Sequence, residues 1–477
     1  MATNKDYREW QRRRGQKPKP KRSFSPFWLL VAVCLGGAYV YRDALPDLAS
    51  QKEIKALADA VTENRFLSSP LVLTKRVTNP VAGYAETLAL PNAEQLDRQA
   101  ASIQYTGNSV KELAAILNGY ATTEAEKARL IYAWIGHHVA YDVQAVLQDR
   151  RGNLSPKGVL SSRLTICSGY ANLYQALAQE MGLEAVIIEG YAKGSSYFVG
   201  EDRDINHAWN GVKVNGGWYL VDVTWGAGTI DNQQFKAKYN PYYFATLPDE
   251  LIYSHFPVES QWQLLPTLYT RAEFDRFPNV SAPFFRDRLR LLTHNSNATI
   301  SSHGRLEIRL AVPDNIVLTA QLIDESGNKL GPNYTFVQKQ GDQSSVNVAF
   351  PRAGQYQLII FSKSKQQEIY HQAIKYKIQS TASAEPFPRI YGTFTEKEAS
   401  VDLPLKQTLA VNHASYFQLK VDEAIKVIVI NKNTNKWTEL TPSNGLFIGS
   451  VVIDPGKTMI AAQFPDSDKY WTLLEYN

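Results

Sequence analysis

The chain has 477 residues, which is long enough for about three domains. Its formal net charge is +5 at pH 7, but residues 1–22 carry a surplus of seven positive charges, which leaves about −2 for the rest. The main body is therefore nearly neutral, and this excludes a strongly basic nucleic-acid-binding surface. The sequence holds no glycine-rich phosphate loop and no Cys/His spacing typical of zinc, so we expect no cofactor and no metal.

The first segment after the basic tail is predicted to cross a membrane. Residues 23–41 contain no charged side chain and are mostly apolar. At about 1.5 Å per residue, a helix of this length spans roughly 28 Å, close to the thickness of a bilayer core. We expect an anchor over residues 23–42, residues 1–22 in the cytoplasm, and the rest outside it, in the periplasm or the extracellular space. A cleaved signal peptide, with small residues at 36–38, and lipidation of Cys34 are the alternatives.

Helices are expected next along the chain. Residues 50–63 and 93–118 have helical patterns, with prolines breaking the sequence between them, and predict a stalk or cap over residues 43–110. A further helix begins after Thr122 or Thr123, either of which can serve as the N-cap. Its apolar stripe consists of Leu130, Ile131, Trp134, Ile135 and Val139.

A cysteine stands at the start of another predicted helix. Apolar residues recur after Cys167 at steps of three and four, and Gly182 is a plausible C-terminal stop. A helix N-terminus favours the thiolate form of cysteine, which is the reactive form. Its backbone N–H groups can also hold an oxyanion. If the anchor exists, Cys167 is the only thiol outside the membrane, because Cys34 is the only other cysteine.

A predicted hairpin places a histidine near an aspartate. Residues 205–214 and 217–225 have strand patterns, and Asn215-Gly216 between them is typical of a type I′ turn. A two-residue loop makes His207 face position 224, with Asp222 diagonal to it on the same face. A three-residue loop would place Asp222 on the opposite face. Cys, His and Asp in this order can build a thiol nucleophile, its base and the carboxylate that orients the base.

The last two hundred residues have the pattern of β-sandwiches. Short alternating strands and turn residues dominate after about residue 275, and the segment that begins at His303 resembles the one that begins at His413. This offset of about 110 residues predicts two modules, over residues 280–380 and 386–477. Neither module contains a cluster of catalytic residue types, so a binding or spacer role is expected there.

Four ordered motifs resemble the transglutaminase-like superfamily of papain-type thiol enzymes, and most closely its kyphoscoliosis peptidase branch. The motifs are Cys167-Ser168-Gly169-Tyr170-Ala171, Gly190-Tyr191-Ala192-Lys193-Gly194, His207-Ala208-Trp209-Asn210 and Asp222 through Gly228. The segment His255-Phe256-Pro257 resembles part of the block that closes the domain in that branch. The resemblance covers roughly residues 110–270 and implies an α+β fold, with a Cys-bearing helix packed on an antiparallel sheet that carries His and Asp.

The resemblance also implies roles for individual residues. Within a core over residues 111–272, Cys167 would be the nucleophile, His207 the general base and Asp222 the orienting residue. The residues around the cysteine differ from those of protein-crosslinking transglutaminases, so hydrolysis and crosslinking both stay open. Four further residues of the motifs are expected to contact substrate: Ser168, Tyr170, Tyr191 and Trp209.

The sequence thus predicts a membrane-anchored thiol enzyme that acts on amide bonds of a protein or of a cell-envelope polymer. The thioester formed on Cys167 would pass to water in a peptidase or amidase, or to an amine in a crosslinking enzyme. Water is the default acceptor unless the protein forms a site for the amine. The alternative is a catalytically silent scaffold that holds such a partner in the groove beside Cys167 and on the two β-modules.

Overall fold

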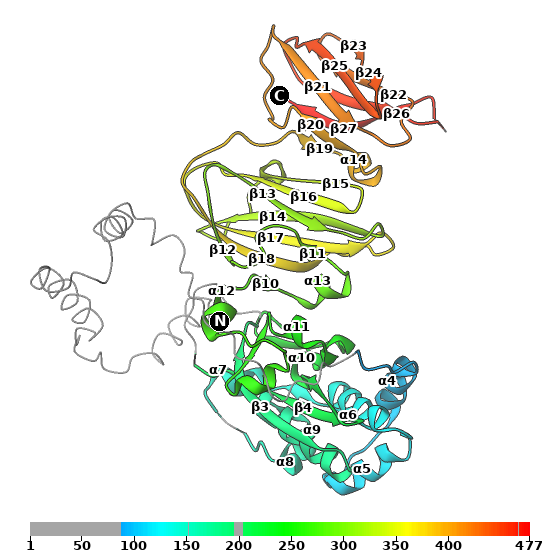
Figure 1. Cartoon of the computed structure of the whole chain (residues 1–477), viewed down its shortest axis with the longest axis vertical. Coiled ribbons are helices and arrows are strands. Elements are labelled where there is room, and N and C mark those ends of the chain that lie inside the picture. Colours follow the sequence, from blue (N-terminus) through cyan, green and yellow to red (C-terminus); the bar gives the residue numbers. More distant parts are fainter. Residues whose placement is uncertain (1–86, 151, 195–203, 466) are drawn as a thin grey trace, which may run out of the picture. The chain divides into compact units, whose positions relative to one another are not determined.

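The computed structural model describes residues 87–150, 152–194, 204–465 and 467–477. Their elements form a mixed α+β core and two β-sandwiches (Figure 1). The predicted fold class is confirmed. The expected helix at 50–63 and the expected anchor at 23–42 lie outside the described residues. No helix within the described ranges is long and apolar enough to span a bilayer.

A five-stranded antiparallel sheet forms the centre of the core. Its strand order is β8-β5-β4-β3-β9. The five strands are β3 (Ala185–Ala192), β4 (His207–Val214), β5 (Gly217–Val221), β8 (Phe244–Thr246) and β9 (His255–Pro257). The remaining core strands are β1 (Ala140–Tyr141), β2 (Leu164–Thr165), β6 (Gly228–Asp231) and β7 (Gln234–Ala237).

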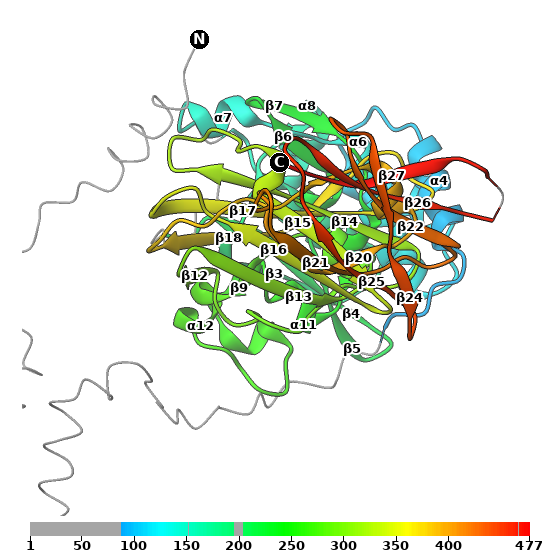
Figure 2. The same cartoon turned by 90° about the horizontal axis from the view of Figure 1, so that it is seen from above.

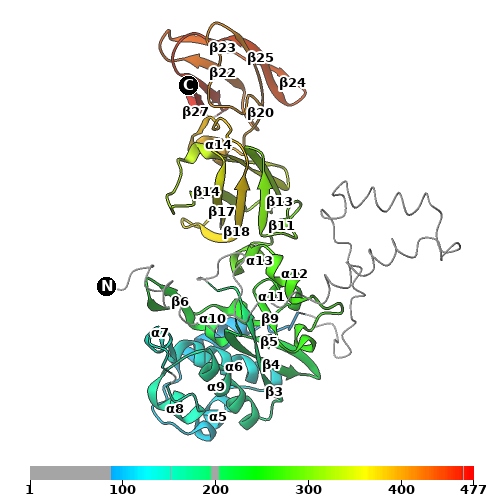
Figure 3. The ribbon, with the colours of Figure 1, turned by 90° about the vertical axis from the view of Figure 1, so that its left-hand side faces the viewer.

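Helices pack on one side of this sheet. Figure 3 shows α6 (Glu124–His138) and α9 (Cys167–Glu180) together beside β3, β4 and β5. The apolar faces of α6, α9 and β4 share one buried cluster, in which Trp134, Leu173 and Val212 are fully buried. Burying these faces against each other fixes the start of α9 relative to the sheet. The other core helices are α4 (Ala93–Ser102), α5 (Val110–Asn118), α7 (Val143–Leu147), α8 (Pro156–Ser162), α10 (Val223–Ala227) and α11 (Pro248–Leu251).

The helices at the start of the core differ in part from those predicted. Thr123 is the N-cap of α6, and its side chain forms a capping box with Glu126, so the second of the two proposed caps is the one used. The single helix expected over 93–118 is wrong, because α4 and α5 are separate. Ile103 leaves α4 in an extended conformation, and the Ser109 side chain accepts the Glu112 N–H to start α5. A serine cap of this kind begins a new helix instead of continuing an old one.

The two β-sandwiches repeat one topology. The first has sheets β10-β18-β17-β14, with β12 parallel to β18, and β11-β13-β16-β15. The second has sheets β19-β27-β26-β22-β23 and β20-β21-β25-β24. The short helix α13 (Ala282–Arg286) has its counterpart in α14 (Gly392–Glu396), 110 residues later. The repeat predicted from the sequence is therefore confirmed, and Figure 2 shows the long strands β17 and β18 of the first module side by side.

The remaining elements belong to these modules. In the first they are α12 (Arg271–Arg276), β10 (Asn279–Val280), β11 (Arg290–Leu291), β12 (Thr299–Ser302), β13 (Arg305–Ala311), β14 (Ile316–Asp324), β15 (Thr335–Gln340), β16 (Gln343–Ala349), β17 (Gly354–Ser364) and β18 (His371–Ser380). In the second they are β19 (Arg389–Ile390), β20 (Ser400–Leu403), β21 (Ala414–Lys420), β22 (Lys426–Asn431), β23 (Lys436–Glu439), β24 (Thr441–Ser443), β25 (Leu446–Val452), β26 (Thr458–Gln463) and β27 (Tyr470–Tyr476).

Candidate active site

The candidate nucleophile is the first residue of a buried helix. Cys167 begins α9 directly after the N-cap Ile166, whose side chain makes no capping hydrogen bond. Gly169 allows this tight start, because a Cβ there would lie 1.9 Å from Thr165 Oγ1. The Tyr170 hydroxyl donates to the Val139 carbonyl at 2.7 Å and fixes the first turn against the end of α6. Cys167 as a whole residue is partly exposed.

The hairpin brings the histidine and the aspartate together. Strands β4 and β5 pair in the predicted two-residue-loop register, with Val214 opposite Gly217 and Asn210 opposite Val221. His207 Nε2 lies 2.8 Å from Asp222 Oδ2, and both side chains are almost fully buried. Because Nε2 is engaged by the carboxylate, Nδ1 is the ring nitrogen left for the thiol.

Asp222 does not lie in a strand, which corrects the predicted strand over 217–225. Strand β5 ends at Val221, and Asp222 is the N-cap of α10. Its Oδ1 accepts the Trp225 N–H at 3.1 Å, while its own N–H donates to the Tyr243 carbonyl. The carboxylate is therefore oriented by the helix that it caps, and Oδ2 remains for His207.

The charges of these three groups depend on one another. Burial alone would lower the pKa of His207, but the charge and hydrogen bond of Asp222, with a smaller contribution from Cys167, raise it to about 10. Burial acts to raise the pKa of the Cys167 thiol, yet the contact with His207 and the Ala208 N–H outweigh it and lower the pKa. Burial likewise acts to raise the pKa of Asp222, and His207 and then His255 hold it well below its usual range. The geometry favours a thiolate–imidazolium pair beside an ionised carboxylate.

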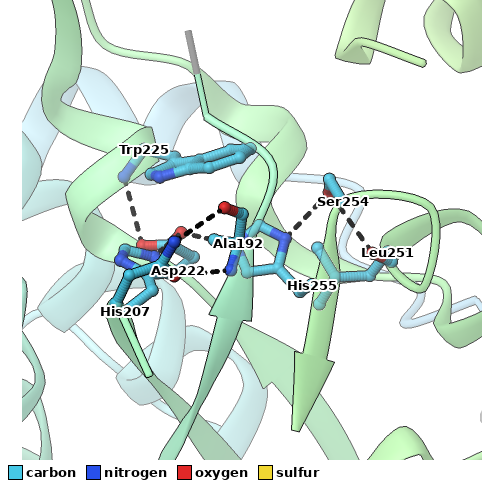
Figure 4. Close-up of polar contacts among 8 residues, drawn as sticks. Ala192, His207, Asp222, Trp225, Leu251, Ser254 and His255 are labelled. Atoms are coloured by element: carbon cyan, nitrogen blue, oxygen red, sulfur yellow. Dashed lines mark hydrogen bonds and ion pairs between the residues drawn. The ribbon is translucent and has the colours of Figure 1, made fainter. Parts of the chain in front are cut away.

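A second histidine reaches the same carboxylate. His255 Nε2 lies 3.0 Å from Asp222 Oδ2, and Ser254 Oγ lies 2.8 Å from His255 Nδ1. Figure 4 shows His207 and His255 both pointing at Asp222, with the Trp225 ring alongside. From the sequence, His255 is predicted only as part of the motif that closes the domain. A histidine between Ser254 and Phe256 in an apolar strand was a usable signal, because a buried imidazole needs partners.

His207, Asp222 and His255 are also the one group of His, Cys, Asp and Glu side chains in the described ranges that lie close enough to share a metal ion. The Nε2 atoms of His207 and His255 lie 2.8 and 3.0 Å from Asp222 Oδ2, and both are hydrogen-bond distances. The three groups satisfy one another in this way, and we assign them hydrogen-bonding roles.

The four expected substrate contacts lie in different environments. Tyr170 and Trp209 are only 1% and 2% exposed, so they lie beneath the site and offer no surface to a substrate in this structure. Ser168 is partly exposed in the first turn of α9. Tyr191 is partly buried, with the Arg271 guanidinium 3.5 Å from its ring centroid. The substrate role of Ser168 and Tyr191 therefore stays a prediction.

Two parts of the chain match known family profiles. Residues 111–223 match the sequence profile of the transglutaminase-like superfamily. The chain contains a transglutaminase-like domain. Residues 271–389 match the profile described as a KY-like, immunoglobulin-like domain, which corresponds to the first sandwich.

Over part of its length, the chain is homologous to kyphoscoliosis peptidase. It is 30% identical to the protein of that name from Mus musculus over 293 residues, 60% of this chain and 43% of the relative. It is 32% identical to hillarin of Drosophila melanogaster over 240 residues, 46% of this chain and 29% of hillarin. A solved structure titled "Crystal structure of a TGase" is 16% identical, covers 40% of this chain and 43% of that one, and has a TM-score of 0.21. The chain spans less than half the length of these curated relatives.

Proposed function

We propose that this protein is a thiol enzyme that acts on amide bonds through Cys167, His207 and Asp222. The observation that carries the proposal is the 2.8 Å contact between His207 and a buried, ionised Asp222, beside a thiol whose pKa is lowered at the start of α9. A surface histidine and a surface cysteine would not show such matched shifts. Perturbed groups that face each other are typical of catalytic sites.

The reaction follows from the positions of these groups. The Cys167 thiolate attacks the amide carbonyl, and the negative charge moves to the carbonyl oxygen. The N–H groups of Cys167 and Ser168, in the first turn of α9, have no acceptor among the described residues and are suited to hold that oxyanion. His207 Nδ1–H then protonates the departing amine, which leaves a thioester on Cys167. His207 next takes a proton from water, which attacks the thioester, releases the acid and restores the thiolate–imidazolium pair.

Hydrolysis is the proposed outcome, so the protein would act as a peptidase or amidase. Water needs no binding site of its own, whereas transfer to a second amine requires one. We further propose that the substrate is a protein or a cell-envelope polymer, and that residues 23–42 anchor the enzyme with the core outside the cytoplasm. These two proposals rest on the sequence, chiefly on the charge-free run at 23–41 and the basic tail before it.

An activated ester tests the thioester route without knowledge of the natural substrate. The protein is mixed with p-nitrophenyl acetate, and nitrophenolate release is followed in rapid mixing. We expect a burst of about one equivalent that disappears in Cys167→Ala and slows in His207→Ala, followed by steady turnover that added primary amine does not accelerate. Acceleration by the amine would show crosslinking chemistry instead. The absence of any burst dependent on Cys167 would refute the enzyme and leave the binding scaffold.

A further inference from the structure

Asp222 serves two imidazoles, and only one of them faces the thiol. His207 comes from the start of β4 and His255 from the start of β9, on either side of β3. The His255 side chain is 0% exposed, and its Nε2 is 3.0 Å from the oxygen that also binds His207. Its pKa is lowered by burial, which the neighbouring Asp222 only partly offsets, so the ring is neutral while His207 carries the charge.

The hydrogen bonds define which nitrogen of His255 carries the proton. An ionised carboxylate only accepts, so Nε2 of both imidazoles donates to Asp222. In neutral His255 the other nitrogen, Nδ1, must then accept, and the Ser254 hydroxyl at 2.8 Å supplies the proton. The Ser254 hydroxyl also lies 3.3 Å from the Leu251 carbonyl, which is a longer contact. The hydroxyl would donate to that carbonyl only if His255 Nδ1 carried a proton and could not accept. Ser254 therefore holds His255 in the tautomer that donates to Asp222.

Among the residues that the structure describes, Asp222 is the one acceptor in contact with the His255 Nε2 proton. The Trp225 ring centroid lies 4.4 Å away and that of Trp209 lies 5.2 Å away. Within the described ranges, the titratable groups that face the ring are Asp222, His207 at 5.3 Å between centroids and Tyr243 at 6.5 Å. Tyr243 is itself kept neutral, because burial and the charge of Asp222 both raise its pKa. The neutral His255 imidazole is thus held among aromatic rings and directs its one N–H at Asp222, so it is suited to orient that carboxylate.

We propose that His255 is a positioning residue that holds Asp222 for the Cys167–His207 pair. The backbone N–H of Trp225 fixes Oδ1, and His255 donates to Oδ2 together with His207. With both oxygens held, the carboxylate cannot turn about its Cβ–Cγ bond, and the His207 ring keeps Nδ1 toward the thiol. Without His255, the carboxylate turns toward whatever donor remains, and the imidazolium that stabilises the thiolate loses part of its partner. The proposal rests on the proposed function, since it assigns His255 to that catalytic pair.

Two amides of different reach test this role. His255→Gln places an amide N–H where Nε2 stands, whereas His255→Asn carries the same amide but ends near the position of Nδ1 and cannot reach Asp222. His255→Phe keeps the ring volume without a donor. The matched control is His138→Phe, because His138 is a partly buried histidine of the same domain whose ring stacks on Trp134, away from the site. The measurement is the rate of Cys167 alkylation by iodoacetamide as a function of pH, with folding checked by circular dichroism.

We expect the Gln variant and the His138 control to follow the wild-type profile within about twofold, because each retains the donor to Asp222. The Asn and Phe variants should shift the acid limb of the profile upward by about one pH unit, toward that of His207→Ala. Ser254→Ala should shift it in the same direction by less. If the Phe variant fails to fold, the comparison of Gln with Asn decides.

The outcomes separate this proposal from the proposed function. If the wild type alkylates at low pH but the Asn and Phe variants do so equally well, His255 has no positioning role and the thiol enzyme stands. If Gln and Asn shift alike, the donor is not responsible, and the proposal is again overturned. If the wild type already follows the His207→Ala profile, the ion pair itself is absent, and the proposed function and the His255 role both fail.

Discussion

Replacing Asp222 by asparagine removes one charge and keeps the shape of the side chain. The two oxygens of Asp222 accept from the Trp225 N–H and from the Nε2 atoms of His207 and His255. An asparagine has one oxygen. If this oxygen stays on the Trp225 N–H, the amide nitrogen faces two imidazole donors. Nε2 of both imidazoles must then be unprotonated, which leaves the ring proton on Nδ1. His207 Nδ1 can then no longer accept the proton of the Cys167 thiol. If the amide turns over, α10 loses its cap instead.

The size of the effect can be worked from the His207 pKa. It rises from 6.5 to about 10 in the fold, and Asp222 is the main source of the rise. At about 1.4 kcal/mol per pKa unit, the whole shift corresponds to roughly 5 kcal/mol, part of which belongs to Cys167. Removing the carboxylate charge should therefore weaken the ion pair by roughly 2–4 kcal/mol, a factor of about 30 to 10³. With the wrong tautomer added, we expect activity to fall by about 10⁴, as in other triads.

Alkylation of Cys167 by iodoacetamide measures this without a substrate. The alkylation rate of the wild type should stay high below neutral pH. In Asp222→Asn, the pH at which the rate is half its maximum should return toward the ordinary thiol pKa of about 8.5. The matched control is Asp142→Asn, because Asp142 is also an N-cap aspartate but caps α7 and does not touch His207. A folded Asp222→Asn protein that still alkylates like the wild type would show that Asp222 does not stabilise the Cys167 thiolate.

Three further changes test other parts of the structure. Burial lowers the pKa of Lys193 from 10.5 to about 7. Between these two pH values the unfolded chain binds one more proton than the folded protein. The free energy of unfolding of the wild type should therefore rise from pH 7 to about pH 10, by up to roughly 4 kcal/mol. Denaturant titrations of Lys193→Met should lack this rise, and an equal rise would contradict the burial argument. Gly169→Ala should lower the free energy of unfolding by about 1–3 kcal/mol, because the new Cβ clashes with Thr165 Oγ1. Adding Thr165→Ala to this variant should recover part of the loss, since the Thr165 hydroxyl has no hydrogen-bond partner among the described residues. Deleting residues 1–42 should give a soluble, folded protein, while full-length protein found soluble at its unprocessed mass would rule out the anchor.

Much of the core was predictable because its signals are local. The Asn215-Gly216 turn sets the β4–β5 register, and the three- and four-residue steps after Cys167 predict α9. The turn at Asp222 was not predictable in this way. The alternation of apolar residues continues past Val221, but the strand ends there because Asp222 caps α10 and because its own N–H donates to the distant Tyr243 carbonyl. The Asn215-Gly216 turn therefore predicts which residues pair within β5, but it does not predict the position of Asp222 beyond the end of that strand.

The position of His255 has a consequence for where the functional unit ends. The superfamily profile stops at residue 223, one residue after Asp222, so it contains the cysteine, the first histidine and the aspartate. Yet Asp222 is buried, and a buried carboxylate requires donors on both oxygens. One donor comes from α10 and another from β9, more than thirty residues later. A chain cut after residue 223 would keep all three residues of the proposed triad but would lose the two groups that orient the carboxylate. The smallest unit with an organised site therefore extends at least through Pro257, where β9 closes the edge of the sheet beside β3.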